Sequence, residues 1–136
     1  MPRYVALVAA RQGEYAVHFP DAPGCSAAGP TVDEAIANAG EALADWVSDE
    51  LAGGRSAPTP RSVEELRQLD SVAQAVARSA MISLVPLVRS SGRLTKANIS
   101  LDSGLLLAID EAADRAGMTR SKFMASAVRE KIEAGA

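Results

Sequence analysis

The chain has few of the residues with which proteins build disulfides and nucleophilic centres. Its 136 residues include one cysteine and one histidine. A single cysteine excludes a disulfide within the chain. His18 lies seven residues before Cys25, so one reading makes them a nucleophile and its base, but the simpler interpretation is that Cys25 is a packing residue and His18 a half-exposed strand residue. No cluster of metal-ligating residues is found either, and we expect no catalytic residue, no metal and no cofactor.

Long hydrophobic runs are also missing. The longest apolar stretch, residues 80–88, contains Ser83 and Pro86 and is far too short to span a membrane. The N-terminus lacks the basic segment and long apolar core of a signal peptide. Gly53 and Gly54 are not followed by the Lys-Ser/Thr of a phosphate-binding loop. These absences predict a cytoplasmic protein with no membrane partner.

Positive charge is in slight deficit, and it is unevenly distributed. The net charge is −3, and residues 1–92 carry seven basic and eleven acidic residues, whereas residues 93–136 carry seven and six. A chain of this charge is not a general binder of polyanions, so any DNA binding depends on individually placed charges. The acidic first part favours a basic protein as its partner.

The pattern from residue 96 to 101 predicts a short strand. Its two faces differ in polarity: Ala97, Ile99 and Leu101 lie on one, and Lys96, Asn98 and Ser100 lie on the other, because successive strand side chains point to opposite sides. A lone strand cannot bury its apolar face or satisfy its edges, and this segment offers no second strand. We therefore expect the same strand of a second copy to pair with it in a dimeric ribbon.

Two amphipathic helices are predicted after this strand. Asp102 or Ser103 can cap the first helix, Gly117 ends it, and Thr119 or Ser121 can cap the second. Apolar residues recur at helical spacing in both: Leu105, Leu106, Ile109, Ala112, Ala113 and Ala116, then Phe123, Met124, Ala127, Val128 and Ile132. Two helices this short cannot close a core alone, which also favours an intertwined dimer.

This order of strand, helix, glycine turn and capped helix resembles the ribbon-helix-helix family of DNA-binding proteins. The resemblance depends on residues 96–101 and 117–122. It implies that Lys96, Asn98 and Ser100 read base edges in a major groove. It also implies a phosphate site at the start of the second helix, formed by Thr119, Arg120, Ser121 and Lys122. The alternative is that the polar residues are only the solvated face of an ordinary edge strand.

Residues 1–90 have the pattern of a separate unit of strands and helices. Residues 3–10 and 14–19 predict a hairpin, and residues 25–28 a third strand after a turn cluster at 20–24. Capping boxes at residues 31–34 and 62–65 each open a helix, and the first helix ends before Gly53. Residues 81–88 have the composition of a buried strand, which Pro86 limits to a sheet edge or a strand end. Residues 90–92 read as a linker, so we place the domains at 1–90 and 91–136.

The first unit resembles the HicB-type antitoxins of bacterial toxin–antitoxin systems. The specific part is the run Phe19-Pro-Asp-Ala-Pro-Gly-Cys25, with Thr31-Val-Asp-Glu-Ala35 and an alanine-rich helix at the right distance after it. The resemblance implies an α+β fold, a partly formed ribonuclease-H-like domain without nuclease activity. It also implies a small basic partner, the HicA-type toxin, which is an mRNA-cleaving ribonuclease. Members of this family often carry a C-terminal DNA-binding module.

These features together predict a non-enzymatic antitoxin that neutralises the toxin, forms a dimer or tetramer and represses its own operon at an operator. Four acidic residues of the first helix are a candidate toxin surface, although a solvated helix face is the simpler interpretation: Asp33, Glu34, Glu41 and Asp45. One alternative is a repressor whose first domain senses a small ligand or only oligomerises. Another is an active nuclease, but the predicted strands hold almost none of the carboxylates that a two-metal site needs.

Overall fold

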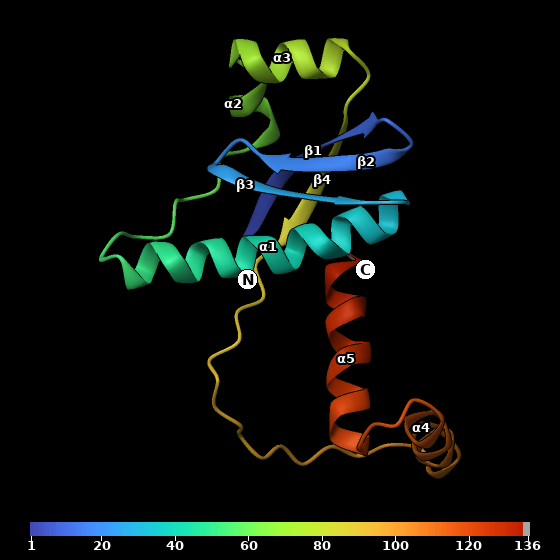
Figure 1. Cartoon of the computed structure of the whole chain (residues 1–136). Coiled ribbons are helices and arrows are strands. Elements are labelled where there is room, and N and C mark those ends of the chain that lie inside the picture. Colours follow the sequence, from blue (N-terminus) through green and yellow to red (C-terminus); the bar gives the residue numbers. More distant parts are fainter. Residues whose placement is uncertain (135–136) are drawn as a thin grey trace.

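A computed structural model describes residues 1–134 and shows a four-stranded sheet with helices on both faces, then an extended segment and two more helices (Figure 1). The elements are β1 (Arg3–Arg11), β2 (Glu14–Phe19), β3 (Ala22–Gly29), α1 (Val32–Ala52), α2 (Val63–Arg67), α3 (Asp70–Ala77), β4 (Met81–Pro86), α4 (Ser103–Arg115) and α5 (Arg120–Glu133). The chain is therefore of mixed α+β class, as predicted. Within residues 1–134, no helix is both long and apolar enough to cross a membrane.

The sheet is antiparallel with strand order β3-β2-β1-β4, so β3 and β4 form its two edges. β1 is paired on both sides: its Val8 lies opposite Val17 of β2 and Met81 of β4. Residues 4–8 are all buried, because alternate side chains enter the cores on the two faces of the sheet. The predicted hairpin between β1 and β2 is confirmed.

Both edge strands contain a proline, and this explains where the predicted strand limits differ from the structure. β3 begins at Ala22 and includes Pro23, so the predicted strand at 25–28 was too short. β4 ends at Pro86, as the missing N–H of proline allows at an edge but not in a central strand. The prediction that Pro86 marks an edge or a strand end is confirmed.

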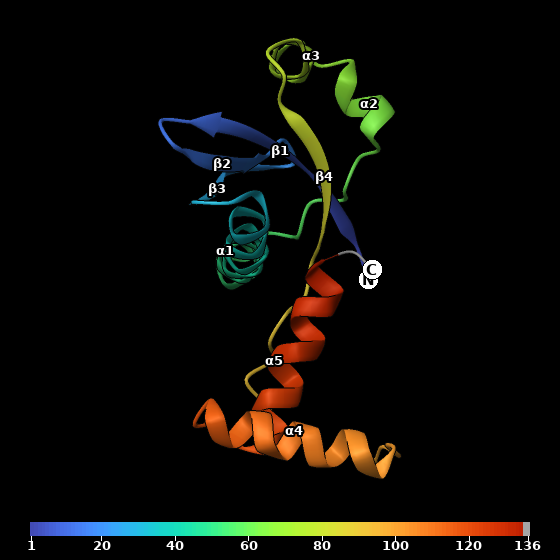
Figure 2. The ribbon, with the colours of Figure 1, turned by 90° about the vertical axis from the view of Figure 1, so that its right-hand side faces the viewer.

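α1 covers one face of the sheet and encloses the larger core (Figure 2). Its buried stripe, Ala35, Ala39, Leu43 and Val47, has the four-residue spacing of one helix face. Thr31 caps the helix by accepting a hydrogen bond from the Glu34 amide at 3.2 Å. The chain enters α1 so closely beside β3 that a Cβ on Gly29 would lie 2.6 Å from the Ala35 nitrogen. A residue larger than glycine at position 29 would push α1 away from the sheet.

α2 and α3 cover the other face, where Leu66 and Val72 pack on Val5 and Leu7. The second capping box opens a helix as predicted, but the structure interrupts the helical region at residues 68–69. In a straight helix Leu66 and Val72 would point about 120° apart, because six residues turn the helix by roughly 600°. The break lets both side chains reach the sheet. The capping box itself forms, since the Ser62 hydroxyl accepts from the Glu65 amide at 3.1 Å.

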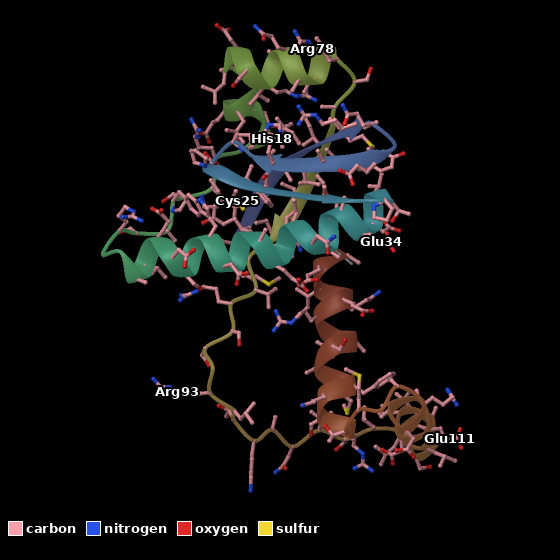
Figure 3. The ribbon with its side chains drawn as sticks, in the orientation of Figure 1. His18, Cys25, Glu34, Arg78, Arg93 and Glu111 are labelled. Carbon is pink, nitrogen blue, oxygen red and sulfur yellow. The ribbon has the colours of Figure 1, made fainter. Side chains whose placement is uncertain are left out.

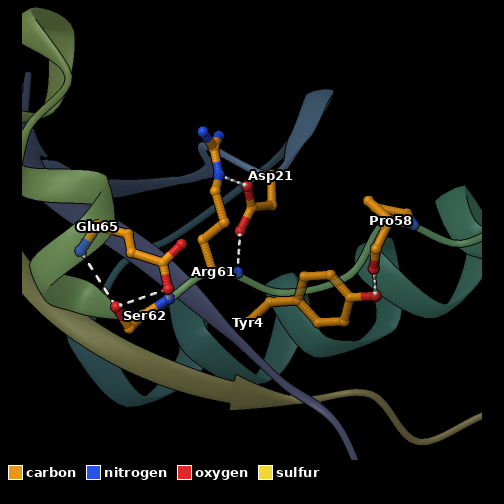
Figure 4. A network of polar contacts seen from close by, with 6 residues as sticks. All are labelled: Tyr4, Asp21, Pro58, Arg61, Ser62 and Glu65. Carbon is orange, nitrogen blue, oxygen red and sulfur yellow. Dashed lines mark hydrogen bonds and ion pairs between the residues drawn. The ribbon is translucent and has the colours of Figure 1, made fainter.

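Polar contacts fix the segment between α1 and α2 against the sheet (Figure 4). The Asp21 carboxylate accepts 2.7 Å hydrogen bonds from both the backbone amide and the Nε of Arg61. The Tyr4 hydroxyl, on β1, donates to the Pro58 carbonyl oxygen. Burial is the main cause that raises the pKa of the Tyr4 phenol, and the charge of Asp21 adds to it. Asp21 of the Phe-Pro-Asp run therefore holds the segment around Arg61 in place.

Residues 87–102 belong to no helix or strand and lead from the sheet to α4. α4 and α5 lie on the far side of α1 from the sheet in Figure 1, and the last turns of α5 reach α1 and β4. At this contact the Glu133 side chain lies 3.6 Å from where a Cβ of Gly40 would be. Burial raises the pKa of the Glu133 carboxyl.

Candidate functional site

α4 and α5 begin where the sequence predicted, and specific side chains cap them. Asp102 caps α4, with Oδ1 accepting from the amides of Gly104 at 2.9 Å and Leu105 at 3.2 Å. Gly117 follows α4 with a positive φ of 65°, a conformation that glycine adopts without strain. Thr119 then caps α5 by accepting from the Lys122 amide at 3.2 Å. Of the two residues proposed for each cap, Asp102 and Thr119 have this role.

The four residues predicted to form the phosphate site make different contacts in the structure. Thr119 is the cap, and Arg120, Ser121 and Lys122 form the exposed first turn of α5. Arg120 makes a two-pronged ion pair with Asp110 of α4, with distances of 2.7 and 2.8 Å. The bond with Arg120 lowers the pKa of the Asp110 carboxyl. In this arrangement Arg120 ties the two helices together, whereas Lys122 takes part in none of the ion pairs recorded for residues 1–134.

The predicted base-reading residues lie in the extended segment before α4. Lys96, Asn98 and Ser100 are all exposed, and the segment around Arg93 loops away from the sheet in Figure 3. Among the described residues no strand of the same chain pairs with residues 96–101. A β-ladder requires a second strand, so the predicted ribbon between two copies stays a prediction.

The same segment and the two helices expose many large apolar side chains. Their exposed fractions are high for apolar residues: Leu94 103%, Ile99 62%, Leu101 38%, Leu105 50%, Leu107 60% and Val128 56%. Across α4 and α5 only Ala113 is buried among the described residues. A soluble chain rarely leaves so much apolar surface uncovered unless it binds a partner.

Only two of the four acidic residues predicted as a toxin surface line a groove, and the toxin surface itself stays a prediction. Asp33 and Glu34, in the first turn of α1, line a groove of about 440 Å³ that is completed by β4 and the end of α5. Glu41 lies beside Gly40, close enough that its charge helps to raise the pKa of Glu133 after the larger effect of burial. Asp45 is exposed further along α1 and is not among the residues that line this groove.

The groove also contains residues that the sequence analysis did not select. They are Ile36 and Ala37 of α1, Ser83 and Leu84 of β4, Glu130 and Glu133 of α5, and Ala134. Figure 3 labels Glu34 next to the end of α5 at this place. The only sequence feature that could have pointed to this groove was the pair of glutamates late in α5, Glu130 and Glu133. No sequence pattern indicated that α5 would reach α1.

His18 and Cys25 both border a cavity of about 290 Å³, but their side chains leave opposite faces of the sheet. Cys25 belongs to the core under α1, whereas the neighbours of His18 on β2, Val17 and Phe19, enter that core and leave His18 on the other face. Figure 3 shows this separation. Burial raises the pKa of the Cys25 thiol, which disfavours the thiolate form that a nucleophile needs. The geometry therefore does not make them a nucleophile and its base.

Within residues 1–134 there is no group of three or more His, Cys, Asp or Glu side chains that could hold a metal ion.

Comparisons with known proteins give consistent results. The family model for HicB-like antitoxins of bacterial toxin–antitoxin systems matches residues 4–128. The crystal structure of the Burkholderia pseudomallei antitoxin HicB matches 96% of this chain and 98% of its own, with 31% identity and a TM-score of 0.55. A chain from the HicA3 and HicB3 toxin–antitoxin complex matches 62% of this chain and 95% of its own, with 22% identity and a TM-score of 0.52, which shows the fold alone. An uncharacterized 14.9 kDa protein of Haemophilus phage HP1 is 28% identical over 120 residues, which cover 87% of this chain and 88% of that protein.

Proposed function

The chain belongs to the HicB-like antitoxin family of bacterial toxin–antitoxin systems, and from this membership we propose that it neutralises a HicA-type mRNA-cleaving toxin and represses its own operon. The observation that carries the proposal is the family match over nearly the whole chain, residues 4–128. The protein acts by binding, not by catalysis. Its partners are the toxin, operator DNA and further copies of itself, and it works in the cytoplasm.

Residues 1–90 bind the toxin in this proposal. Their acidic charge suits a small basic protein, and a solved structure with this fold is named as a complex of HicA3 with HicB3. We assign the unit to a partly formed ribonuclease-H-like fold, as its resemblance to the HicB-type antitoxins implies. Glu14 is the only acidic residue in the four strands of the sheet, which supports a role without two-metal nuclease chemistry.

Residues 91–136 form a ribbon-helix-helix dimer in this proposal. The exposed apolar side chains of Ile99, Leu101, Leu105 and Val128 support it, because a second copy would cover them. Lys96, Asn98 and Ser100 would read bases from the ribbon, and the amides at Thr119 to Lys122 would hold a phosphate. Two such dimers on neighbouring half-sites would make a tetramer.

The DNA-binding part is tested by the double substitution Lys96→Ala with Asn98→Ala. We expect it to abolish specific binding to the promoter DNA of its own operon, measured by fluorescence anisotropy, while the dimer mass from light scattering stays unchanged. The matched control is Gln74→Ala on α3 with Arg78→Ala just after it, which also removes one amide and one cation. Operator binding that survives in the first variant would refute the assignment of these residues.

The toxin-binding part is tested by capture from the native host. The tagged full chain is purified at high salt, and the bound proteins are identified by mass spectrometry. We expect a small basic protein that cleaves RNA once it is separated. Recovery of only the chain and its promoter DNA would favour the alternative, a repressor whose N-terminal domain senses a small ligand or only oligomerises.

A further inference from the structure

The outer edge of β4 is open for pairing with another strand. β4 is an edge strand of the sheet, and the Leu87 amide donates to the Pro2 carbonyl at 2.9 Å, toward β1. Because backbone groups of a strand alternate in direction, Ile82 and Leu84 direct their N–H and C=O groups away from β1. Pro86 has no N–H and closes this edge at its end. The open edge is therefore the short stretch around Ile82 and Leu84.

The end of α5 reaches β4, but the sequence of the strand itself lacks the features that usually keep an edge from pairing. The sequence of β4, Met-Ile-Ser-Leu-Val-Pro, has no charged residue, and its proline is the last residue of the strand. Natural edge strands are commonly protected by lysine, a central proline, a bulge or a cover. Met81 and Leu84 instead expose 43% and 46% of their surface. An apolar edge of this kind favours the addition of a partner strand.

Carboxylates surround the groove beside the open edge. Asp33 and Glu34 come from the start of α1, and Glu130 and Glu133 come from the end of α5. None of the ion pairs recorded for residues 1–134 uses any of the four. Burial raises the pKa of the Glu133 carboxyl, the charge of Arg129 lowers it, and the charges of Glu41 and Glu130 raise it. The groove thus combines an apolar floor, Ile36 and Leu84, with a negative rim.

We infer that the open edge of β4 and this groove form the docking site for a basic β-strand of the toxin. The inference depends on the proposed function. The added strand pairs with Ile82 and Leu84 through the backbone, and its lysine or arginine side chains reach Glu34 and Glu130. A second copy of this chain fits less well, because it would bring an identical set of four carboxylates to the same edge. Since α5 supplies half of the rim, a bound toxin also contacts a helix of the DNA-binding unit.

The test uses the full chain and the small basic protein that capture from the native host provides. Leu84→Lys places a charge on the edge, and its control is Leu69→Lys, at a leucine between α2 and α3 that is 36% exposed. Glu34→Gln with Glu130→Gln removes charge from the rim, and its control is Glu64→Gln with Glu111→Gln, one change in each half of the chain. We expect both test variants to weaken binding at least about tenfold by calorimetry and the controls to stay within about twofold. In the wild-type complex, hydrogen exchange of the Ile82 and Leu84 amides should slow by about tenfold or more.

The possible outcomes separate this inference from the proposed function. If the wild-type chain binds the basic protein but the test variants bind equally well, the docking site is wrong and the antitoxin function stands. If Leu84→Lys lowers the assembly mass of the chain alone, a second copy occupies the edge and the inference is overturned. If the wild-type chain captures no basic protein, both proposals fail. Melting temperatures of all variants, measured first, show whether a loss of binding reflects unfolding.

Discussion

Replacing Asp21 by alanine should destabilise the N-terminal unit by about 2–3 kcal/mol, because it removes two hydrogen bonds from Arg61. The bond from the backbone amide contributes more than the bond from the guanidinium. The Asp21 side chain is 5% exposed, and its carboxylate accepts a hydrogen bond from the Arg61 backbone amide at 2.7 Å. A hydrogen bond to a charged group contributes about 1.5–3 kcal/mol. The side chain of Arg61 is 42% exposed, so solvent screens the ion pair and limits its contribution to roughly 1 kcal/mol or less. Arg61→Ala keeps the backbone amide and should therefore cost about 1 kcal/mol.

Urea unfolding followed by circular dichroism, at one protein concentration for all variants, measures both free energies. The midpoint for Asp21→Ala should fall by about 1–2 M, since small domains lose roughly 1–3 kcal/mol of stability per molar urea. Two results would refute the reasoning. A loss below about 0.5 kcal/mol for Asp21→Ala, within the usual range of surface changes, would show that the segment is held by other contacts. An equal loss for Arg61→Ala would show that the ion pair, not the backbone bond, stabilises it.

Three further predictions concern the two cores and the contact of α5. Leu66→Ala should cost about 2–5 kcal/mol by the same urea assay because it opens a cavity under α2, whereas the exposed Leu69→Ala should cost less than about 1 kcal/mol. Cys25 should react with Ellman's reagent far more slowly in the native protein than in urea, because burial covers the thiol and raises its pKa; equal rates would contradict its place in the core. The raised pKa of Glu133 favours the neutral acid in the folded state, so the contact with α1 should weaken as the pH rises from the ordinary range of a carboxyl through the raised value. Glu133→Gln should remove this pH dependence, measured as hydrogen exchange in the last turn of α5.

Local signals in the sequence predicted most elements of the N-terminal unit. The hairpin of β1 and β2, the caps at Thr31 and Ser62 and the proline that ends β4 depend on neighbouring residues only, and the structure confirms them. The break between α2 and α3 depends instead on where Leu66 and Val72 must reach, which a helical pattern does not encode. The caps of α4 and α5 were likewise predictable, because they too are local.

The groove could not be predicted, since it depends on contacts between distant parts of the chain. Glu34, Leu84 and Glu130 are separated by about fifty residues each in the sequence and meet only when α5 reaches α1. The ion pair between Arg120 and Asp110 was missed for a similar reason: the sequence indicated a cation at the start of α5 but not the position of α4. The pairing of residues 96–101 between two copies lies beyond what a single chain can show, and it stays a prediction.

The most direct test of the antitoxin account is RNA cleavage by the captured basic protein, measured with increasing amounts of this full chain. The account predicts that cleavage stops near one equivalent of chain per toxin and returns when the complex is dissociated by denaturant and the toxin is refolded alone. The Lys96→Ala and Asn98→Ala variant should inhibit equally well, because its defect lies in DNA binding. Cleavage that continues unchanged with a molar excess of folded chain would contradict the account.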